Sequence, residues 1–484
     1  MGYEPVIGLE VHVQLKTNTK LFCSCSTEFG LAANENVCPV CTAQPGALPV
    51  INKKAVELSV RTALALNCTI HNKSLFARKS YFYPDLPKNY QISQYEQPLS
   101  ENGELLIKTE TGEAKRIRIK RIHLEEDAGK LIHDIGSRKL DYSLVDYNRT
   151  GIPLLEIVSE PDINSPDEAY NYLSALKQIL QYIEISDCDM EKGFLRCDAN
   201  ASVHIKGEKL GTRTELKNMN SFKAVREALA YEINRQMALA QAGAKVVQET
   251  LLWDPDTSTT KSMRSKEEAH DYRYFPEPDL MPLIVSDEMI NKIKSQIGEL
   301  PKIRKQRFIS KYGLTEYDAG VLTAEKPLSE YYENMINAIP GTESGDAAKL
   351  ASNWLTTELL GRLNRINKSI TESPVSYKDM AKLVELIKKD TISGKIAKTV
   401  FAEMFDTSSS PEKIVKEKGL LQITDESSIK KLVEEVVKEN SAIVEQYKGG
   451  KAQAFGSLVG AVMKKSQGKA NPQMVNRLLK ELTG

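Results

Sequence analysis

The hydrophobic pattern of the chain changes once, at the Pro-rich stretch 275–282, and this change limits the possible folds more than any other feature. From Glu299 to about Phe405 the apolar residues recur at helical spacing throughout. Before the change, short β-branched runs alternate with turn signals and with helical patterns near 51–66, 165–183 and 222–243. We therefore predict an α+β domain that is followed by an all-α region.

The same pattern gives expected domain boundaries. The α+β domain should span residues 1–291, a helical domain 292–407, and a small helical tail domain 408–484. Turn-forming clusters at 339–345 and 407–411 interrupt the helical part. A length of 484 residues agrees with several domains of about 150 residues each.

The charge balance excludes a chain-wide attraction to nucleic acid or membrane. Lys plus Arg and Asp plus Glu each number 65, so RNA binding would require a local patch. No apolar run approaches the roughly 18 residues that span a bilayer. The N-terminus has an early Glu4 instead of a basic, apolar signal pattern. We expect a soluble, cytoplasmic protein with no membrane partner.

Polar side chains in two separate segments predict a divalent-metal site. The residues from Val6 to Leu15 alternate like a strand with one apolar face, so Glu10 and His12 project together from the other face. The segment 123–130 adds an acidic cluster that contains Glu125. Carboxylates with one imidazole suit an ion such as Mg²⁺, which commonly bridges protein carboxylates and nucleotide phosphates. The alternative is a solvated strand face beside a salt-bridged loop.

Four of the seven cysteines lie within the segment 23–41 and predict a structural zinc site, a zinc-ribbon-like insert in the first domain. They are Cys23, Cys25, Cys38 and Cys41. Two close pairs at this spacing bring four thiolates to one tetrahedral ion and leave no open position for catalysis. Two disulfides are the alternative, but they need an oxidising compartment, for which nothing else in the sequence argues.

Four other stretches of the first domain are rich in polar and aromatic residues. Residues 77–91 interleave lysines with tyrosines, which can neutralise phosphates and stack on a base, although a Pro-kinked surface loop is an equal alternative. Residues 145–158 form a turn that leads into a strand. Residues 195–204 and 212–221 should pair as two strands across the turn at Gly207. Their charged side chains would then line one face of a sheet.

Two absences from the sequence narrow the chemistry. The chain has neither a GxxxxGK[ST] phosphate loop nor a GxGxxG motif. A nucleotide would therefore be held by a sheet and metals instead of by a helix N-terminus. The sequence also lacks a Cys–His nucleophile context and a Gly/Ser-rich amidase segment, so we do not expect it to hydrolyse glutamine by itself.

Several long motifs resemble the B-subunit family of the bacterial tRNA-dependent amidotransferases. They are VIGLEVHV at 6–13, YFYPDLPK at 81–88, YQISQY at 90–95, HLEEDAGK at 123–130, the 145–158 stretch and DYRYFPEPD at 271–279. The similarity continues to the tail, at 451–482. The resemblance implies a glutamine-synthetase-like catalytic domain, called the cradle, followed by a helical domain and a small helical tail. It also implies a heterotrimer, in which an amidase A subunit releases ammonia from glutamine and a small C subunit wraps both partners.

The resemblance further implies a reaction in two steps. Mg-ATP phosphorylates the side-chain carboxylate of Glu-tRNA(Gln) or Asp-tRNA(Asn), and ammonia then displaces the phosphate. On this basis we assign Glu10, His12 and Glu125 to the principal Mg²⁺, and Glu126, Asp198 and Glu215 to a second ion or its surroundings. Lys79, Tyr81 and Lys88 are the expected nucleotide contacts, and Arg149 and Arg196 the expected contacts of the acyl-phosphate.

Two other functions stay open at this point. A free-standing ATP-dependent ligase or kinase acting on a small carboxylate would not need the basic tail helices. A non-catalytic RNA-binding scaffold would not need Glu10, His12 and Glu125. From Asn440 to Gly484 there are seven basic and two acidic residues, a net charge of 7 − 2 = +5, which favours tRNA binding over a solvated helix face. The role of 271–274 and the preferred tRNA are left open.

Overall fold

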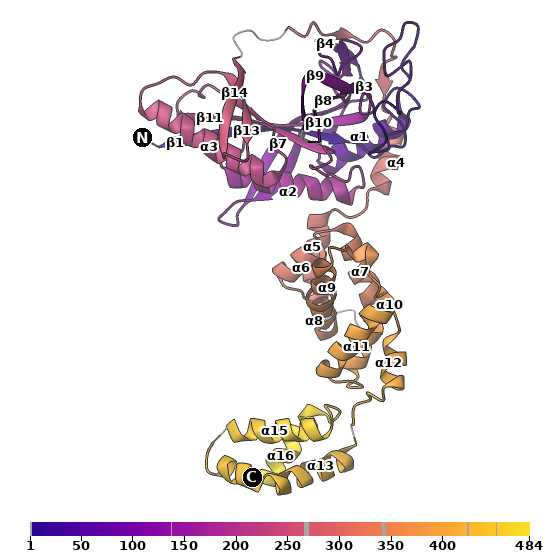
Figure 1. Ribbon diagram of the computed structural model, residues 1–484, viewed down its shortest axis with the longest axis vertical. Helices are drawn as coiled ribbons and strands as arrows, with labels where there is room; N and C mark the ends of the chain where they lie inside the picture. Colours follow the sequence, from indigo (N-terminus) through magenta and orange to yellow (C-terminus); the bar gives the residue numbers. More distant parts are fainter. Residues whose placement is uncertain (1, 137, 266–270, 341–344, 424, 452) are drawn as a thin grey trace. The chain divides into compact units, whose positions relative to one another are not determined.

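The computed structural model describes residues 2–136, 138–265, 271–340, 345–423, 425–451 and 453–484. It contains two compact units, Met1–Leu300 and Pro301–Gly484. The first combines strands with helices and the second is helical, which confirms the predicted α+β class with an all-α region after it (Figure 1). The first unit extends past residue 291 because helix α4 (Asp287–Gln296) packs against helix α1 (Lys53–Ala65).

A nine-stranded sheet forms the centre of the first unit. Its strand order is β14-β13-β12-β11-β1-β10-β7-β6-β2. Neighbouring strands run antiparallel, except that β12 and β13 are parallel. In that order, the strands are Thr259–Ser265, Glu249–Asp254, Thr214–Lys217, Leu195–Ile205, Tyr3–Gln14, Pro153–Ser159, Ala114–Glu126, Ser100–Lys108 and Thr69–Ile70.

Strand β1 lies in the middle of this sheet, paired with β10 on one side and β11 on the other. Its alternate side chains Ile7, Leu9, Val11 and Val13 are fully buried in the core of the first unit. Helices α2 (Pro166–Tyr182) and α3 (Phe222–Gln241) bury their apolar faces in the same core. Because side chains alternate along a strand, the polar residues of β1 lie on the opposite face, as predicted.

The three helices expected in this unit are confirmed, and each begins at a polar cap. The side chain of Asn52 accepts hydrogen bonds from the backbone at the start of α1. Ser165 caps α2 in the same way, with Pro166 in the first turn, and Ser221 caps α3. Helix α3 also anchors β12, because the buried Glu232 accepts a hydrogen bond from Thr214 Oγ1 at 2.8 Å.

Three small sheets flank the large one. Strand β4 (Ala77–Ser80) pairs with β5 (Tyr90–Ser93) and with β15 (Phe275–Pro276). The other two sheets are two-stranded: β3 (Lys73–Ser74) with β16 (Leu283–Ile284), and β8 (Lys130–Ile135) with β9 (Arg138–Asp146). The pairing of β4 with β15 brings the segment 271–276 next to residues 77–81, far away in the sequence.

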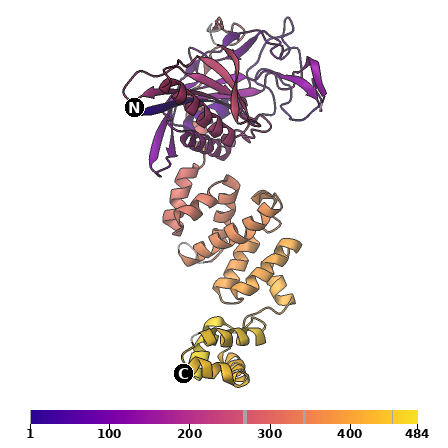
Figure 2. The ribbon, with the colours of Figure 1, turned by 60° about the vertical axis from the view of Figure 1, so that its left-hand side comes forward.

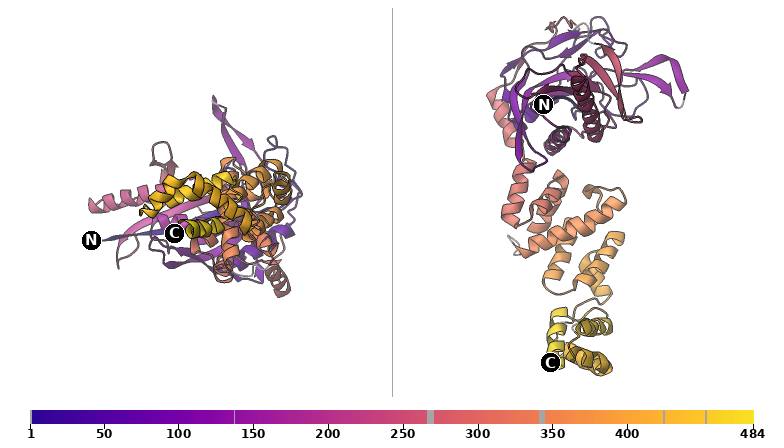
Figure 3. Two further views of the ribbon diagram at one scale, coloured as in Figure 1. Left: turned by 90° about the horizontal axis from the view of Figure 1, so that it is seen from below. Right: turned by 90° about the vertical axis from the view of Figure 1, so that its left-hand side faces the viewer.

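The second unit consists of helices (Figures 2 and 3). They are α5 (Pro301–Tyr312), α6 (Glu316–Leu322), α7 (Lys326–Asn337), α8 (Asp346–Asn353), a π-helical turn (Trp354–Leu359), α9 (Leu360–Arg365), a 3-10 turn (Ile370–Glu372), α10 (Tyr377–Lys388), α11 (Gly394–Thr407), α12 (Pro411–Glu417), α13 (Glu426–Glu439), α14 (Ser441–Lys448), α15 (Gln453–Lys465) and α16 (Pro472–Thr483). Among the described residues, no helix is long and apolar enough to cross a membrane.

The helices of the second unit enclose two separate hydrophobic cores. The larger core runs from Phe308 to Val415 and includes the buried Ile414 of α12. The smaller core belongs to α13–α16, in which Leu458 and Val462 are fully buried. Helix α12 thus packs with the helices before it, although the sequence placed residue 411 in the tail. The expected boundary at 408 remains a prediction that this packing does not decide.

Candidate functional site

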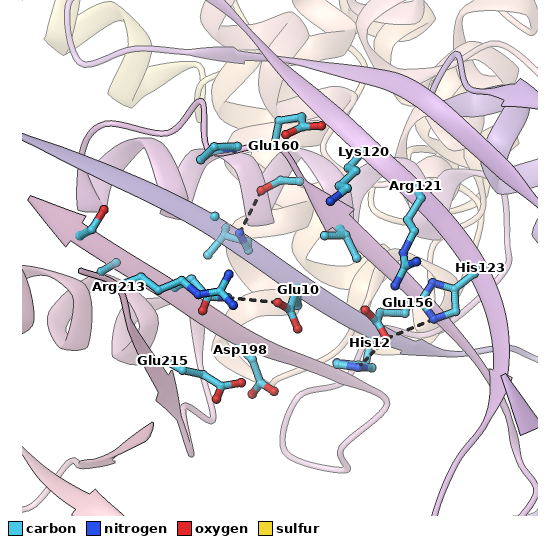
Figure 4. A pocket seen from close by; sticks show the side chains of 18 of the residues that line it. Glu10, His12, Lys120, Arg121, His123, Glu156, Glu160, Asp198, Arg213 and Glu215 are labelled. Atoms are coloured by element: carbon cyan, nitrogen blue, oxygen red, sulfur yellow. Dashed lines mark hydrogen bonds and ion pairs between the residues drawn. The ribbon is translucent and has the colours of Figure 1, made fainter. Parts of the chain in front are cut away.

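A cavity of about 1140 Å³ lies on the polar face of the large sheet. Side chains from β1, β7, β10, β11 and β12 line it, among them Glu10, His12 and Glu156 (Figure 4). Tyr272 and Tyr274 line it as well. Strand register explains which polar groups meet. His12 lies opposite Glu156, and Glu156 lies opposite His123, so the three form one row across three strands.

His12, Glu125 and Glu156 place one possible ligand atom each within 4.8 Å of the others. The Nε2 atom of His12 lies 3.5 Å from Glu156 Oε2 and 3.9 Å from Glu125 Oε1. His123 Nε2 lies 3.3 Å from Glu156 and 3.5 Å from Glu125, and Ser93 Oγ donates to Glu125 at 2.9 Å. Both carboxylates are buried, so the sheet holds two negative charges out of water.

The electrostatics of this cluster favour a cation among its carboxylates. Burial disfavours the charged form of both histidines. The hydrogen bond to Glu156 and the negative charge of Glu156 nevertheless raise the pKa of His12. Glu156 and Glu125 together raise the pKa of His123 to about 9. Burial alone would raise the pKa values of Glu125 and Glu156, yet the imidazoles hold both below their usual range. Without a metal, the protonated imidazoles supply the positive charge that these carboxylates need; a bound cation would supply it in their place, and His12 would then lose its proton and ligate as neutral imidazole. Two carboxylates and one imidazole also match the donor set of a divalent ion such as Mg²⁺.

Glu10 lies in a neighbouring group instead of in this cluster. It faces Asp198 across the β1–β11 pair and accepts a hydrogen bond from Asn200 Nδ2 at 3.1 Å. Burial, and then the charges of Glu156 and Asp198, raise the pKa of Glu10. The ammonium of Lys217 contacts Asp198 and lies 3.2 Å from Glu215. Two of the three predicted second-ion carboxylates, Asp198 and Glu215, therefore come together, but a lysine lies between them.

Two of the predicted nucleotide contacts lie near the metal-type cluster. Lys79 lines the cavity and lies over the ring of Tyr272, 4.9 Å from its centroid. Burial opposes its charge, but nearby acidic groups, led by Glu125, raise the pKa of Lys79. Tyr81 meets the ring of Tyr272 edge-on at 6.1 Å. Tyr274 stacks on Tyr95 at 4.0 Å, so the 271–274 segment adds aromatic side chains to the wall of the cavity.

The third predicted nucleotide contact, Lys88, lies in a different place. Its ammonium forms a buried ion pair with Glu126 at 2.6 Å. Both residues line a separate cavity of about 350 Å³, which Cys23 and Cys41 also line. The structure thus brings Lys88 and Glu126 to each other, and not to the cluster of His12, Glu125 and Glu156.

The two predicted acyl-phosphate contacts are both engaged by Asp127. Arg196 donates to the two carboxylate oxygens of this buried aspartate at 2.9 and 3.0 Å. Arg149 lies 3.7 Å from Asp127 and donates to the carbonyls of Ala128 and Gly129. Burial would raise the pKa of Asp127, but the two guanidinium groups hold it below its usual range. Neither arginine is among the side chains that line the large cavity.

The four predicted zinc ligands converge. Possible ligand atoms of Cys23, Cys25, Cys38 and Cys41 all lie within 4.8 Å of one another. The backbone N–H of Cys38 donates to Cys41 Sγ at 3.1 Å, so the second pair of cysteines is joined locally. Hydrogen bonding from Cys23, the largest effect, lowers the pKa of the Cys41 thiol despite its burial. Four converging sulfur atoms fit a tetrahedral zinc ion.

Several residues of the site had no role assigned from the sequence. Glu156 completes the cluster with His12, and His123 supports both carboxylates. His123 could have been found, because it stands two residues before Glu125 and so shares its strand face. Lys120, Arg121 and Arg213 add positive charge to the cavity lining. Their positions depend on strand pairing, which the local sequence pattern does not specify.

Comparisons with known proteins agree across the whole chain. A family model described as the GatB/GatE catalytic domain matches residues 5–291, and one described as the GatB domain matches residues 331–482. The chain is 56% identical over 480 residues to the B subunit of the aspartyl/glutamyl-tRNA(Asn/Gln) amidotransferase of Carboxydothermus hydrogenoformans, covering 99% of this chain and 98% of that protein. Proteins of the same name from Thermoanaerobacter pseudethanolicus and Geobacter sulfurreducens are each 54% identical, with 99% and 100% of both chains covered, respectively.

Proposed function

Because the chain belongs to the GatB/GatE family, we propose that it is the subunit of a tRNA-dependent amidotransferase that activates and amidates an aminoacyl-tRNA. Its substrates are Glu-tRNA(Gln), Asp-tRNA(Asn) or both, and its partners are an amidase A subunit and a small C subunit. One observation supports the assignment most strongly: the cluster of His12, Glu125 and Glu156, of which His12 and Glu156 line the large cavity. A cytoplasmic location follows from the same proposal, since aminoacyl-tRNA is the substrate.

The chemistry explains why such a cluster is needed. A carboxylate oxygen of the aminoacyl side chain attacks the γ-phosphorus of ATP and ADP leaves; ammonia then attacks the acyl carbon and inorganic phosphate leaves. His12, Glu125 and Glu156 would hold Mg²⁺, which offsets the charge on the transferring phosphoryl group. His123 and Ser93 keep Glu125 oriented through their contacts. The second proposed ion would share Asp198 and Glu215 with Lys217.

The cations that line the cavity are the best candidates for phosphate contacts. Lys79 lies close to the metal-type cluster, and Lys120, Arg121 and Arg213 line the cavity. The tyrosines that surround Lys79 offer faces for a base to stack on. We keep Lys79 and Tyr81 as nucleotide contacts on this ground. Lys88, Arg149 and Arg196 serve the site by positioning Glu126 and Asp127, because their charges are already paired.

A comparison of the isolated chain with the assembled complex separates this function from the alternatives. The chain alone should not convert Glu-tRNA(Gln) to Gln-tRNA(Gln) with glutamine as nitrogen source, whereas the complex with the A and C subunits should. A free-standing ligase would act on a small carboxylate without partners. A scaffold would contribute no phosphorylation in any mixture.

Replacing Glu125 tests the metal-type cluster. Glu125→Gln preserves shape but removes one charge, so the complex should form phosphorylated Glu-tRNA at least about 100-fold more slowly, near the 3 kcal/mol typical of lost transition-state electrostatics. The rate is measured with ATP labelled in its γ-phosphate. Glutamine hydrolysis by the partner subunit should change much less. The exposed Glu113→Gln is the matched control, and wild-type phosphorylation by Glu125→Gln would contradict the assignment.

The cysteine cluster leads to a separate prediction. We propose that Cys23, Cys25, Cys38 and Cys41 hold one structural Zn²⁺, because their sulfur atoms converge. Reduced protein should then contain close to one zinc per chain. Cys38→Ser should lose the metal and lower the melting temperature far more than it lowers the rate per folded molecule. Cys68→Ser, at a cysteine outside the cluster, should keep the zinc; a metal-free wild-type protein would refute the site.

The tail helices are proposed to hold tRNA by its backbone. Lys465 and Arg477 are already paired with Glu435, Glu439 and Glu426. Among the described residues, the other basic side chains of this segment form no ion pair: Lys448, Lys451, Lys464, Lys469 and Lys480. Each phosphate contact contributes roughly one unit to the slope of log affinity against log salt.

Ending the chain at Gln422 tests the tail and spares helix α12, which belongs to the larger core. The truncated complex should bind Glu-tRNA(Gln) more weakly and with a flatter salt dependence. Ammonia production and ATP binding should be retained because those sites lie elsewhere. Binding is measured by filter retention between low and physiological salt. An unchanged KM for Glu-tRNA(Gln) would exclude the tail as a tRNA-binding element.

A further inference from the structure

Lys20 is a fully buried lysine beside the cysteine cluster. Its ammonium donates to the backbone carbonyl of Asn36 at 2.6 Å and to that of Tyr147 at 3.3 Å. The third contact is to Cys41 Sγ, at 3.6 Å. An ammonium has three hydrogens to donate, so these three acceptors satisfy all its hydrogen bonds.

The hydrogen bonds alone do not balance the charge of Lys20. A buried ammonium is strongly destabilising unless an anion lies beside it. Among the residues that the structure describes, no carboxylate forms an ion pair with Lys20. Two of its three acceptors are neutral carbonyls. The group in contact with it that can carry a negative charge is the sulfur of Cys41.

The cysteine cluster, by contrast, carries an excess of negative charge when a divalent ion is bound. Four thiolates around one divalent ion carry a formal charge of 4 × (−1) + 2 = −2. Cys41 is buried, and among the described residues its sulfur accepts hydrogen bonds from the backbone N–H of Cys38 and from the ammonium of Lys20. A second positive charge next to the sulfur would therefore stabilise the metal-bound state.

We propose that Lys20 is the built-in countercharge of the metal–thiolate cluster, a positioning residue that keeps the metal bound. This inference rests on the proposed zinc site. The same ammonium connects the cluster to the loop at 147–151, because the carbonyl of Tyr147 is one of its acceptors. The neighbouring residue Leu21 adds a second contact to this loop, from its N–H to the carbonyl of Gly151 at 2.8 Å. Arg149 of this loop binds the carbonyls that follow Asp127. Lys20 thus connects the cysteine insert to the end of strand β7.

The first experiment measures zinc retention in the assembled complex. Lys20→Met keeps the length of the side chain and removes its charge. Zinc should transfer from Lys20→Met to a chromophoric chelator at least about ten-fold faster than from the wild type. Metal affinity commonly falls by such a factor when a residue that contacts a metal ligand is replaced. The matched control is Lys16→Met, since Lys16 is exposed and pairs with Asp187. Equal release rates for Lys20→Met and the wild type would overturn the proposal.

A second variant tests whether charge is the reason. Cys41→His replaces a thiolate ligand by a neutral one and lowers the negative charge of the cluster by one unit. In this background, Lys20→Met should have a much smaller effect on zinc release. An equal effect in both backgrounds would overturn the countercharge role. If Lys20→Met does not fold, the double variant Lys20→Met, Cys41→His decides. A folded, zinc-bound double variant supports the proposal, and an unfolded double variant overturns the proposal.

The outcomes also separate this inference from the proposals on which it depends. A wild-type protein without zinc would overturn both the zinc site and the role of Lys20. The amidotransferase assignment would be untouched by that result, because it is tested by phosphorylation in Glu125→Gln. A zinc-bound wild type with unchanged release from Lys20→Met would overturn the role of Lys20 alone.

Discussion

The pairing of β1 with β10 and β11 fixes the positions of four polar groups that line the large cavity: Glu10, His12, Glu156 and Asp198. His12 lies opposite Glu156, and Glu10 lies opposite Asp198, because the apolar side chains of β1 must face the core. A register shift of one residue would bury these polar groups and expose Leu9 and Val11. The hydrophobic effect therefore selects the register, and the register assembles the site.

Burial then gives the site its electrostatic character. Glu125 and Glu156 are held ionised in the sheet by the two histidines, while the less strongly compensated Glu10 has a raised pKa. Other charges are neutralised locally: Lys88 pairs with Glu126, and Arg196 pairs with Asp127. None of these four residues lines the large cavity, and the pairing leaves little of their charge for a substrate. The close grouping of Glu125 and Glu156 around His12 is the feature that suits a divalent ion.

Local sequence pattern predicted the parts of this structure that depend on local physics. The alternation in β1, the helices α1, α2 and α3, and the convergence of Cys23 with Cys41 all follow from spacing along the chain. The partner of each charged residue could not be predicted in the same way. Glu156 meets His12 across a strand pair that joins distant segments, and the sequence does not specify its register.

The same limit explains the different fates of the predicted basic residues. Lys79, Lys88, Arg149 and Arg196 all carry one positive charge and occur in similar polar stretches. Lys79 faces the large cavity, whereas the other three are engaged by Glu126 or Asp127. Residue type thus identified groups able to bind phosphate, but their availability depends on tertiary ion pairs.

The account rests on the cluster of His12, Glu125 and Glu156 as a divalent-ion site, and metal binding tests this claim without any assay of turnover. Mn²⁺ is titrated into the assembled complex, and free Mn²⁺ is followed by electron paramagnetic resonance, for the wild type and for Glu156→Gln. The wild type should bind Mn²⁺ in this cavity, and the variant should bind it at least about ten-fold more weakly. Equal affinities in the two proteins would contradict the claim.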